Sequence, residues 1–81
     1  MYLKLFVSKD CPRCPAAREA VYSVGERVEV YDIDEAMGLA EAAFYNVLCT
    51  PSLLVVDEQG REVRGWRCEV PSPREITSAL N

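Results

Sequence analysis

The stretch from Ser8 to Ala20, SKDCPRCPAAREA, carries two of the four cysteines of the protein, Cys11 and Cys14, two residues apart. A proline follows each cysteine, and apolar residues then recur at spacings of three and four as far as Gly25. This spacing is typical of an amphipathic helix, whose first turn readily accepts proline. The stretch therefore predicts a Cys-x-x-Cys turn at the start of a helix. The two cysteines are a redox couple, half of a metal site or a structural link.

Strands are predicted on both sides of this helix. From Tyr2 to Ser8, alternate side chains form two sets, both largely apolar. One set is Leu3, Leu5 and Val7, and the other is Tyr2, Lys4 and Phe6. Because successive side chains of a strand point to opposite faces, this segment predicts a strand that is covered on both sides. The helix is expected to end at Gly25, and its apolar residues at helical spacing are Ala16, Ala17, Ala20, Val21 and Val24. Arg27 to Ile33, rich in β-branched residues, predicts the next strand.

A second helix is predicted between Asp34 and Tyr45. Asp34 is a favourable N-cap residue, and Gly38 inside the segment is expected to cost some helical stability. The apolar stripe expected to face the interior is Ala36, Leu39, Ala40, Ala43 and Phe44.

The C-terminal part predicts a β-hairpin and a last helix. Residues 52–56 form a nearly continuous apolar run, and the turn at residues 57–60 leads to a partner strand at residues 61–65. The helix signals are an N-cap, a first-turn proline and a capping box at Ser72, Pro73 and Glu75, with Ile76, Ala79 and Leu80 facing inward. The complete order, βαβαββα, predicts an α/β domain with a four-stranded mixed sheet flanked by three helices.

Length and composition restrict the protein further. Its 81 residues, 49% of them hydrophobic and 27% charged, allow one globular domain, residues 1–81. The net charge is −4 and the basic residues are scattered, which argues against a nucleic-acid partner. No apolar run is long enough for a membrane span, and the N-terminus does not resemble a signal peptide, so we expect a cytoplasmic monomer. In that compartment, cysteines serve catalysis or metal binding more often than structural disulfides.

The position of the two cysteines predicts different roles for them. A cysteine at a helix N-terminus meets unpaired backbone N–H groups and the positive end of the helix dipole, which favour the thiolate. We therefore expect Cys11 to be the nucleophile and Cys14, one turn further on, to resolve the mixed disulfide that Cys11 forms. Pro12 orders the turn, and Arg13 brings a cation near the thiolate.

A strand that runs into Cys-x-x-Cys at a helix start, together with Thr50-Pro51 before a buried strand, resembles the thioredoxin-like superfamily, in particular its small glutaredoxin-like thioredoxins and redoxins. The resemblance implies the thioredoxin-like fold and a cis Thr50-Pro51 bond close to Cys11. It also implies that the backbone of Thr50 binds an extended substrate segment in a groove shaped by Pro51. We assign the substrate-binding residues as Pro12, Arg13, Thr50, Pro51 and Trp66.

The same resemblance implies a thiol-disulfide oxidoreductase without a bound cofactor or metal. Its partners would be protein disulfide substrates, ribonucleotide reductase among them, and a thioredoxin-reductase-type flavoprotein or a low-molecular-weight thiol as electron donor. Asp10 replaces the tryptophan of ordinary thioredoxins, and Leu5 stands where their buried aspartate falls. The alternatives are a glutathione-dependent glutaredoxin and a metal-binding or delivery module. The glycine pair with which glutaredoxins hold glutathione is missing at residues 65–68, which argues against the first alternative. Eighteen residues lie between the other two cysteines, rather than the two that are typical of a zinc site, which argues against the second.

Three residues near the expected groove have alternative roles. Cys49 and Cys68 are expected to be small apolar fillers or idle thiols, the default for isolated cysteines, with a disulfide clip or a second redox couple as alternatives. Trp66 is expected at the rim of the groove, partly exposed to a partner protein, with core packing as the equally supported alternative.

Overall fold

The strand that precedes the Cys-x-x-Cys turn, β1 (Tyr2–Val7), lies in the interior of a four-stranded sheet. The computed structural model describes residues 1–81 and gives the strand order β2-β1-β3-β4. β2 (Val28–Asp32) is parallel to β1, whereas β3 (Ser52–Val56) is antiparallel to both β1 and β4 (Glu62–Arg67). The predicted mixed sheet and the order βαβαββα are confirmed.

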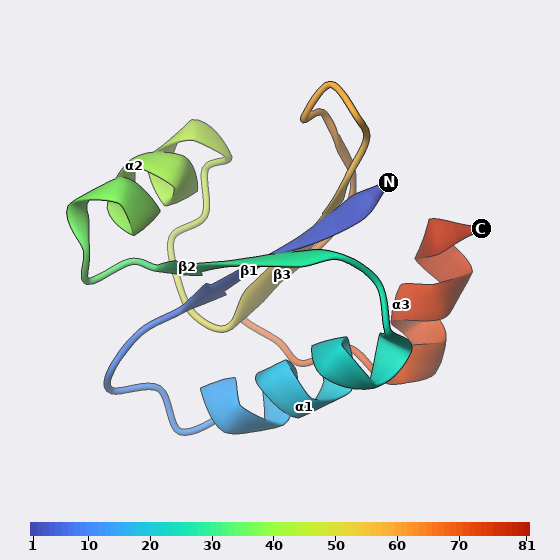
Figure 1. The fold of residues 1–81 in the computed structure, drawn as a ribbon. Helices are drawn as coiled ribbons and strands as arrows, with labels where there is room; N and C mark the ends of the chain where they lie inside the picture. The colour runs from blue at the N-terminus through green and yellow to red at the C-terminus, as the bar shows by residue number, and fades with distance from the viewer.

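Three helices cover the two faces of this sheet, as Figure 1 shows. α1 (Cys14–Val24) and α3 (Pro73–Leu80) contact each other on one face, and α2 (Ala36–Phe44) lies on the other. None of these helices is long and apolar enough to cross a membrane.

The alternation predicted for β1 decides how the two faces are filled. Leu3, Leu5 and Val7 belong to the larger core, which also takes in buried residues of α1 and α3. Phe6 belongs to the smaller core beneath α2. Because β1 is buried on both faces, its near-continuous apolar sequence is what its position in the sheet requires.

The ends of α1 and α3 follow their local sequence signals. Gly25 has a φ of 78°, a conformation that favours glycine, and its N–H donates to the carbonyl of Tyr22 at 3.2 Å. Ser72 and Glu75 form both bonds of a capping box. Both predictions of helix termini are confirmed.

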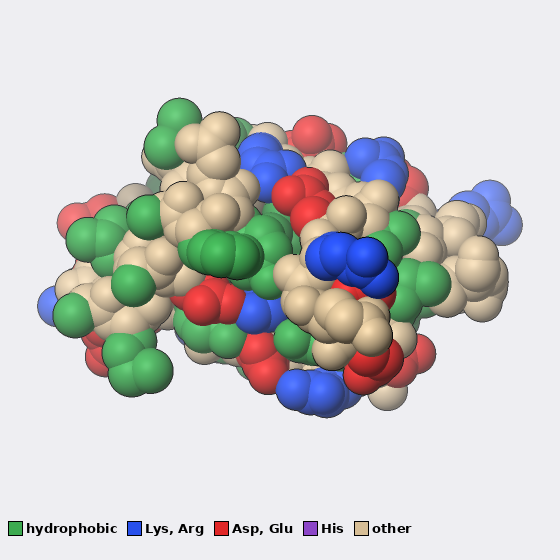
Figure 2. All heavy atoms as spheres, turned by 90° about the horizontal axis from the view of Figure 1, so that it is seen from above, with side chains coloured by type: hydrophobic (Ala, Val, Ile, Leu, Met, Phe, Trp, Pro, Cys, Tyr) green, Lys and Arg blue, Asp and Glu red, His purple; other side chains and the backbone are tan.

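The orientation predicted for α2 is wrong. Its expected inward stripe lies on the solvent side, where Phe44 is 77% exposed, and the residues that face the sheet are Gly38 and Ala42. Figure 2 shows the apolar side chains gathered on this side of the molecule. Asp34 is not the cap either, because Glu35 occupies the N-cap position without a side-chain bond.

Small residues explain why α2 turns this way. The core beneath it is already filled by large side chains, Phe6, Leu54 and Val56 among them. A Cβ at position 38 would collide with the backbone carbonyl of Asp32, so glycine permits the close approach of helix and sheet. Gly38 thus lowers intrinsic helix propensity but enables the packing.

Lys4 is a buried cation between β1 and α2. Its ammonium group pairs with Glu41 of α2 and lies 3.7 Å from a carboxylate oxygen of Glu29. It also lies over the rings of Tyr31 and Tyr45, at 5.3 and 5.1 Å from their centroids. Burial lowers the pKa of Lys4, but the hydrogen bond and the attraction of Glu41 outweigh it, so the net pKa is raised. Lys4 therefore stays charged and ties α2 to the sheet.

Candidate redox site

The sheet topology gathers three distant chain segments at one edge. Phe6 of β1 pairs with Ser52 of β3, and Ser52 pairs with Arg67 of β4. The end of β1, the start of β3 and the end of β4 therefore meet at the same end of the sheet. The Cys-x-x-Cys turn follows the first of these segments, the Thr50-Pro51 peptide precedes the second, and Cys68 follows the third.

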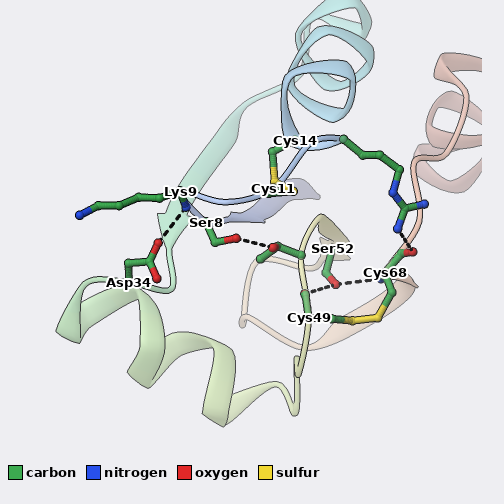
Figure 3. The surroundings of a disulfide bond; sticks show 10 residues. Ser8, Lys9, Cys11, Cys14, Asp34, Cys49, Ser52 and Cys68 are labelled. Carbon is green, nitrogen blue, oxygen red and sulfur yellow. Dashed lines mark hydrogen bonds between the residues drawn. A yellow bond between two sulfur atoms is a disulfide. The ribbon is translucent and has the colours of Figure 1, made fainter.

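Cys11 and Cys14 form a disulfide, with their Cα atoms 5.4 Å apart (Figure 3). The helix starts at Cys14 rather than at Cys11, and the N–H of Cys14 donates to the carbonyl of Cys11 at 3.2 Å. Cys11 is partly exposed, whereas Cys14 is 4% exposed and belongs to the larger core. An external disulfide can thus reach Cys11, and the second sulfur lies protected behind it.

Two hydrogen bonds hold the neighbouring loops in place. The hydroxyl groups of Ser8, after β1, and Thr50 are 2.6 Å apart, and the backbone N–H of Lys9 donates to the carboxylate of Asp34 at 2.8 Å (Figure 3). The Thr50-Pro51 bond is cis, as predicted. Asp34, expected as a helix cap, instead anchors the segment that leads to Cys11.

Cys49 and Cys68 form a second disulfide, with a Cα–Cα distance of 5.5 Å across a sequence separation of 19. The expectation that they are unpaired fillers is wrong, and the clip alternative is what the structure contains. Ser52, fully buried, donates from its hydroxyl to the carbonyl of Cys49 at 2.9 Å and accepts the N–H of Cys68 at 3.2 Å. No local sequence signal identified Ser8 or Ser52, because the sheet register brings Thr50 to Ser8 and Cys68 to Ser52.

Arg13 connects the Cys-x-x-Cys turn to the second disulfide. Its guanidinium donates to the carbonyl of Cys68 at 2.9 Å, and its side chain lies at the protein surface. The structure thus brings together five of the predicted site residues, which are Cys11, Cys14, Arg13, Thr50 and Pro51. The adjacent Pro12 is exposed.

The expectation that Trp66 lies partly exposed at the rim is wrong. The side chain is 2% exposed and packs in the larger core, and the guanidinium of Arg64 lies 4.6 Å from the centroid of its ring. The register of β3 and β4 pairs Trp66 with Leu53, and both residues belong to the core on the face that α1 and α3 cover. Core packing, the alternative interpretation, is correct.

The fold is shared with solved structures. Thioredoxin 1 of Thermosipho africanus superimposes with a TM-score of 0.81 at 19% identity, over 99% of this chain and 90% of that one. The chain has the thioredoxin-like fold. Two other thioredoxins have the same fold. That of Thermus thermophilus superimposes with a TM-score of 0.72 at 22% identity, over 98% of this chain and 69% of that one. Thioredoxin-2 of a malaria parasite superimposes with a TM-score of 0.76 at 14% identity, over 98% of this chain and 79% of that one. No protein-family model and no curated protein sequence matches the chain.

The group at this site that can react is the Cys11–Cys14 disulfide, whose chemistry is thiol–disulfide exchange. All four cysteines are paired, two and two, so Cys49 and Cys68 do not join Cys11 and Cys14 in a single fourfold cluster. The molecule has two surface hollows, of about 530 and 390 Å³, and no cysteine lines either of them. The candidate redox site is therefore an open surface rather than an enclosed pocket.

Proposed function

We propose that the protein is a dithiol–disulfide oxidoreductase that reduces disulfides of client proteins through Cys11 and Cys14. The observation that carries the proposal is the disulfide between a partly exposed and a buried cysteine at the start of α1, in a thioredoxin-like fold. This asymmetry suits a couple in which one sulfur meets the substrate and the other acts afterwards.

The reaction begins with the reduced protein. The Cys11 thiolate attacks one sulfur of the client disulfide, and the other client sulfur leaves as a thiolate, so that a mixed disulfide joins client and Cys11. The Cys14 thiolate then attacks the sulfur of Cys11 and expels the second client thiolate. Two electrons pass to the client, which takes up two protons from water, and the Cys11–Cys14 disulfide remains.

A protein client fits this site better than a small molecule. The Cys11–Cys14 disulfide lies on an open surface, and neither of the two hollows is lined by its cysteines. Drug-sized ligands are usually bound in concave pockets. An extended client segment, in contrast, needs only an accessible backbone edge and a reachable sulfur. We assign the edge to Thr50, which the Ser8 hydroxyl steadies, and the contacts beside Cys11 to Pro12 and Arg13. Pro51 is fully buried, so it shapes the loop beneath the edge and does not touch the client.

The electron donor we propose is a thioredoxin-reductase-type flavoprotein or a low-molecular-weight thiol, in a cytoplasmic setting. Ribonucleotide reductase is the client that the resemblance to small redoxins suggests. Reduction of insulin with each donor in turn separates the two routes: activity with the flavoprotein and NADPH supports the first, and activity with glutathione alone supports a glutaredoxin.

A trapping experiment tests the mechanism. Cys14→Ser is expected to form the first mixed disulfide with a protein substrate and then to stall, because no second thiolate remains to release it. Cys11→Ser, the matched control, is expected to form none. Non-reducing electrophoresis followed by mass mapping locates the bond. A client bond on Cys49 or Cys68 with none on Cys11, or insulin reduction by Cys11→Ser, would show that the nucleophile is wrongly assigned.

A further inference from the structure

The Cys49–Cys68 disulfide, called the clip below, links two sides of the redox site. Cys49 lies directly before the Thr50-Pro51 peptide, and Cys68 directly follows β4. In Figure 3 the clip and the Cys11–Cys14 disulfide lie on opposite sides of the loop that carries this peptide and Ser52. Opening the clip therefore removes a covalent link that supports the backbone edge at Thr50, which we assign to client binding.

The backbone at Cys68 depends on the clip. Cys68 has a φ of 64°, a left-handed conformation that a residue with a side chain rarely adopts. Two interactions hold it there, the covalent bond to Cys49 and the N–H bond to the Ser52 hydroxyl. In this conformation its carbonyl accepts the Arg13 guanidinium. Opening the clip removes the covalent restraint and frees Cys68, and with it the partner of Arg13, to move.

The clip is also accessible to a thiol. Cys68 is exposed and Cys49 is half-buried, which repeats the asymmetry of the Cys11–Cys14 pair. A thiolate therefore reaches the sulfur of Cys68 first, and the sulfur of Cys49 is the leaving group. Exposed disulfides are the labile class among protein disulfides, whereas buried ones resist reduction.

We propose that the clip is a second redox-active site, which thiols open and low-molecular-weight disulfides close, and that its closed state favours the binding of protein clients. The proposal rests on the proposed function for its effect on clients, but not for its chemistry. An incoming thiolate forms a mixed disulfide with Cys68 and releases the Cys49 thiolate. A second thiol then releases Cys68, so that the clip gains two electrons and two protons and the two incoming thiols leave as a disulfide.

The incoming thiol has two possible sources with the same chemistry. One is a low-molecular-weight thiol, and the other is the reduced Cys11/Cys14 pair of another copy of the protein. Two variants separate these sources. In Cys11→Ser/Cys14→Ser the clip is the sole disulfide, and in Cys49→Ala/Cys68→Ala the Cys11–Cys14 pair is the sole dithiol.

The first experiment titrates the clip. Cys11→Ser/Cys14→Ser is equilibrated with mixtures of reduced and oxidised glutathione, or with the prereduced Cys49→Ala/Cys68→Ala variant, and free thiols are counted by alkylation and mass spectrometry. Gain of two labelled thiols in the folded protein, in at least one arm, is expected, and the arm identifies the source. A clip that stays closed in both arms, at ratios that fully reduce the Cys11–Cys14 pair, would overturn the proposal and make the clip a permanent structural link.

The second experiment measures the effect on clients in a Cys14→Ser background, where only the first chemical step occurs. Replacing both clip cysteines by alanine in this background is expected to slow mixed-disulfide formation with insulin about three- to tenfold, within the range of a lost positioning contact. The rate with a small aromatic disulfide, which needs no groove, is expected to change less than twofold. Equal rates with insulin, or equal losses with both substrates, would refute the role in client binding.

A further variant covers the case in which removal of the clip unfolds the protein. Arg13→Ala in the Cys14→Ser background breaks the same contact to the Cys68 carbonyl. Because Arg13 is also assigned to client contacts, the expected result is a loss with insulin together with a rate that no longer depends on whether the clip is open or closed. No loss with Arg13→Ala would refute the contact as the link between clip and site. If Cys14→Ser with a closed clip reacts with neither disulfide, the proposed function fails, whereas the titration of the clip still stands.

Discussion

Replacement of Lys4 tests how α2 is held on the sheet. Lys4 is 6% exposed, and its two carboxylate partners, Glu41 and Glu29, keep side-chain exposures of 28% and 33%. Replacing Lys4 removes two contributions to the free energy of unfolding, which have to be separated. One is burial of the aliphatic stem, and the other is the ion pair with its aromatic surroundings.

The structure indicates which loss is larger. Lys4→Ala removes three buried methylene groups beyond Cβ, at about 0.8 kcal/mol each, which gives about 2.4 kcal/mol. The ion pair adds about 1 kcal/mol rather than the 3–5 kcal/mol typical of a fully buried pair, because the carboxylates left behind still reach water. We expect a loss of about 3 kcal/mol for Lys4→Ala and about 1 kcal/mol for Lys4→Met, which keeps a stem of similar length.

These losses are measurable by thermal unfolding followed by circular dichroism, without reductant so that both disulfides stay closed. At about 5 °C per kcal/mol for a domain of this size, Tm is expected to fall by about 15 °C for Lys4→Ala and about 5 °C for Lys4→Met. Lys9→Ala is the matched control, since the side chain of Lys9 is exposed, and a change within about 0.5 kcal/mol is expected. If Lys4→Met loses as much as Lys4→Ala, the charge dominates and the argument from the stem is wrong. If neither is destabilised, the burial of Lys4 does not hold α2.

Three other predictions follow from single features. Iodoacetamide is expected to alkylate Cys11 of the reduced protein at least about ten times faster than Cys14, because Cys11 is partly exposed whereas Cys14 is buried; peptide mapping that finds Cys14 modified first would contradict this. Gly38→Ala is expected to destabilise the fold by about 1–3 kcal/mol in urea unfolding, because the new Cβ meets the sheet backbone, and an unchanged midpoint would show that the helix can shift. The bond from the Tyr31 hydroxyl to Glu29 holds the pKa of that carboxyl below its usual range, so its stabilisation is present above about pH 4.3 and is lost as the pH falls through the lowered pKa; Glu29→Gln is expected to flatten this part of the stability profile, and an identical acid profile would count against the bond.

Elements that depend on neighbouring residues were predictable from the sequence. The capping box at Ser72 and Glu75 joins residues three apart, and the glycine after α1 ends the helix through a bond to a residue in its own last turn. The alternation in β1 is likewise a property of one extended segment. The Cys-x-x-Cys turn belongs to the same class, since its two sulfurs are joined within one helical turn.

Features that depend on the packing of distant segments were not predictable. The sequence of α2 contains a regular apolar stripe, but the helix places Gly38 and Ala42 against the sheet instead, because the core there is already filled and only small residues allow close contact. Trp66 likewise lies inside because the β3–β4 register directs it to the face that α1 and α3 cover.

The four cysteines show the same division within one site. Their count, and the spacing of Cys11 and Cys14, determined the candidate redox pair from the sequence alone. The pairing of Cys49 with Cys68 was decided only when the antiparallel register of β3 and β4 brought together two residues that are 19 positions apart. Local spacing fixes what lies within a turn of a helix or strand, whereas contacts across a sheet are set by the register of the whole fold, which no short stretch of sequence contains.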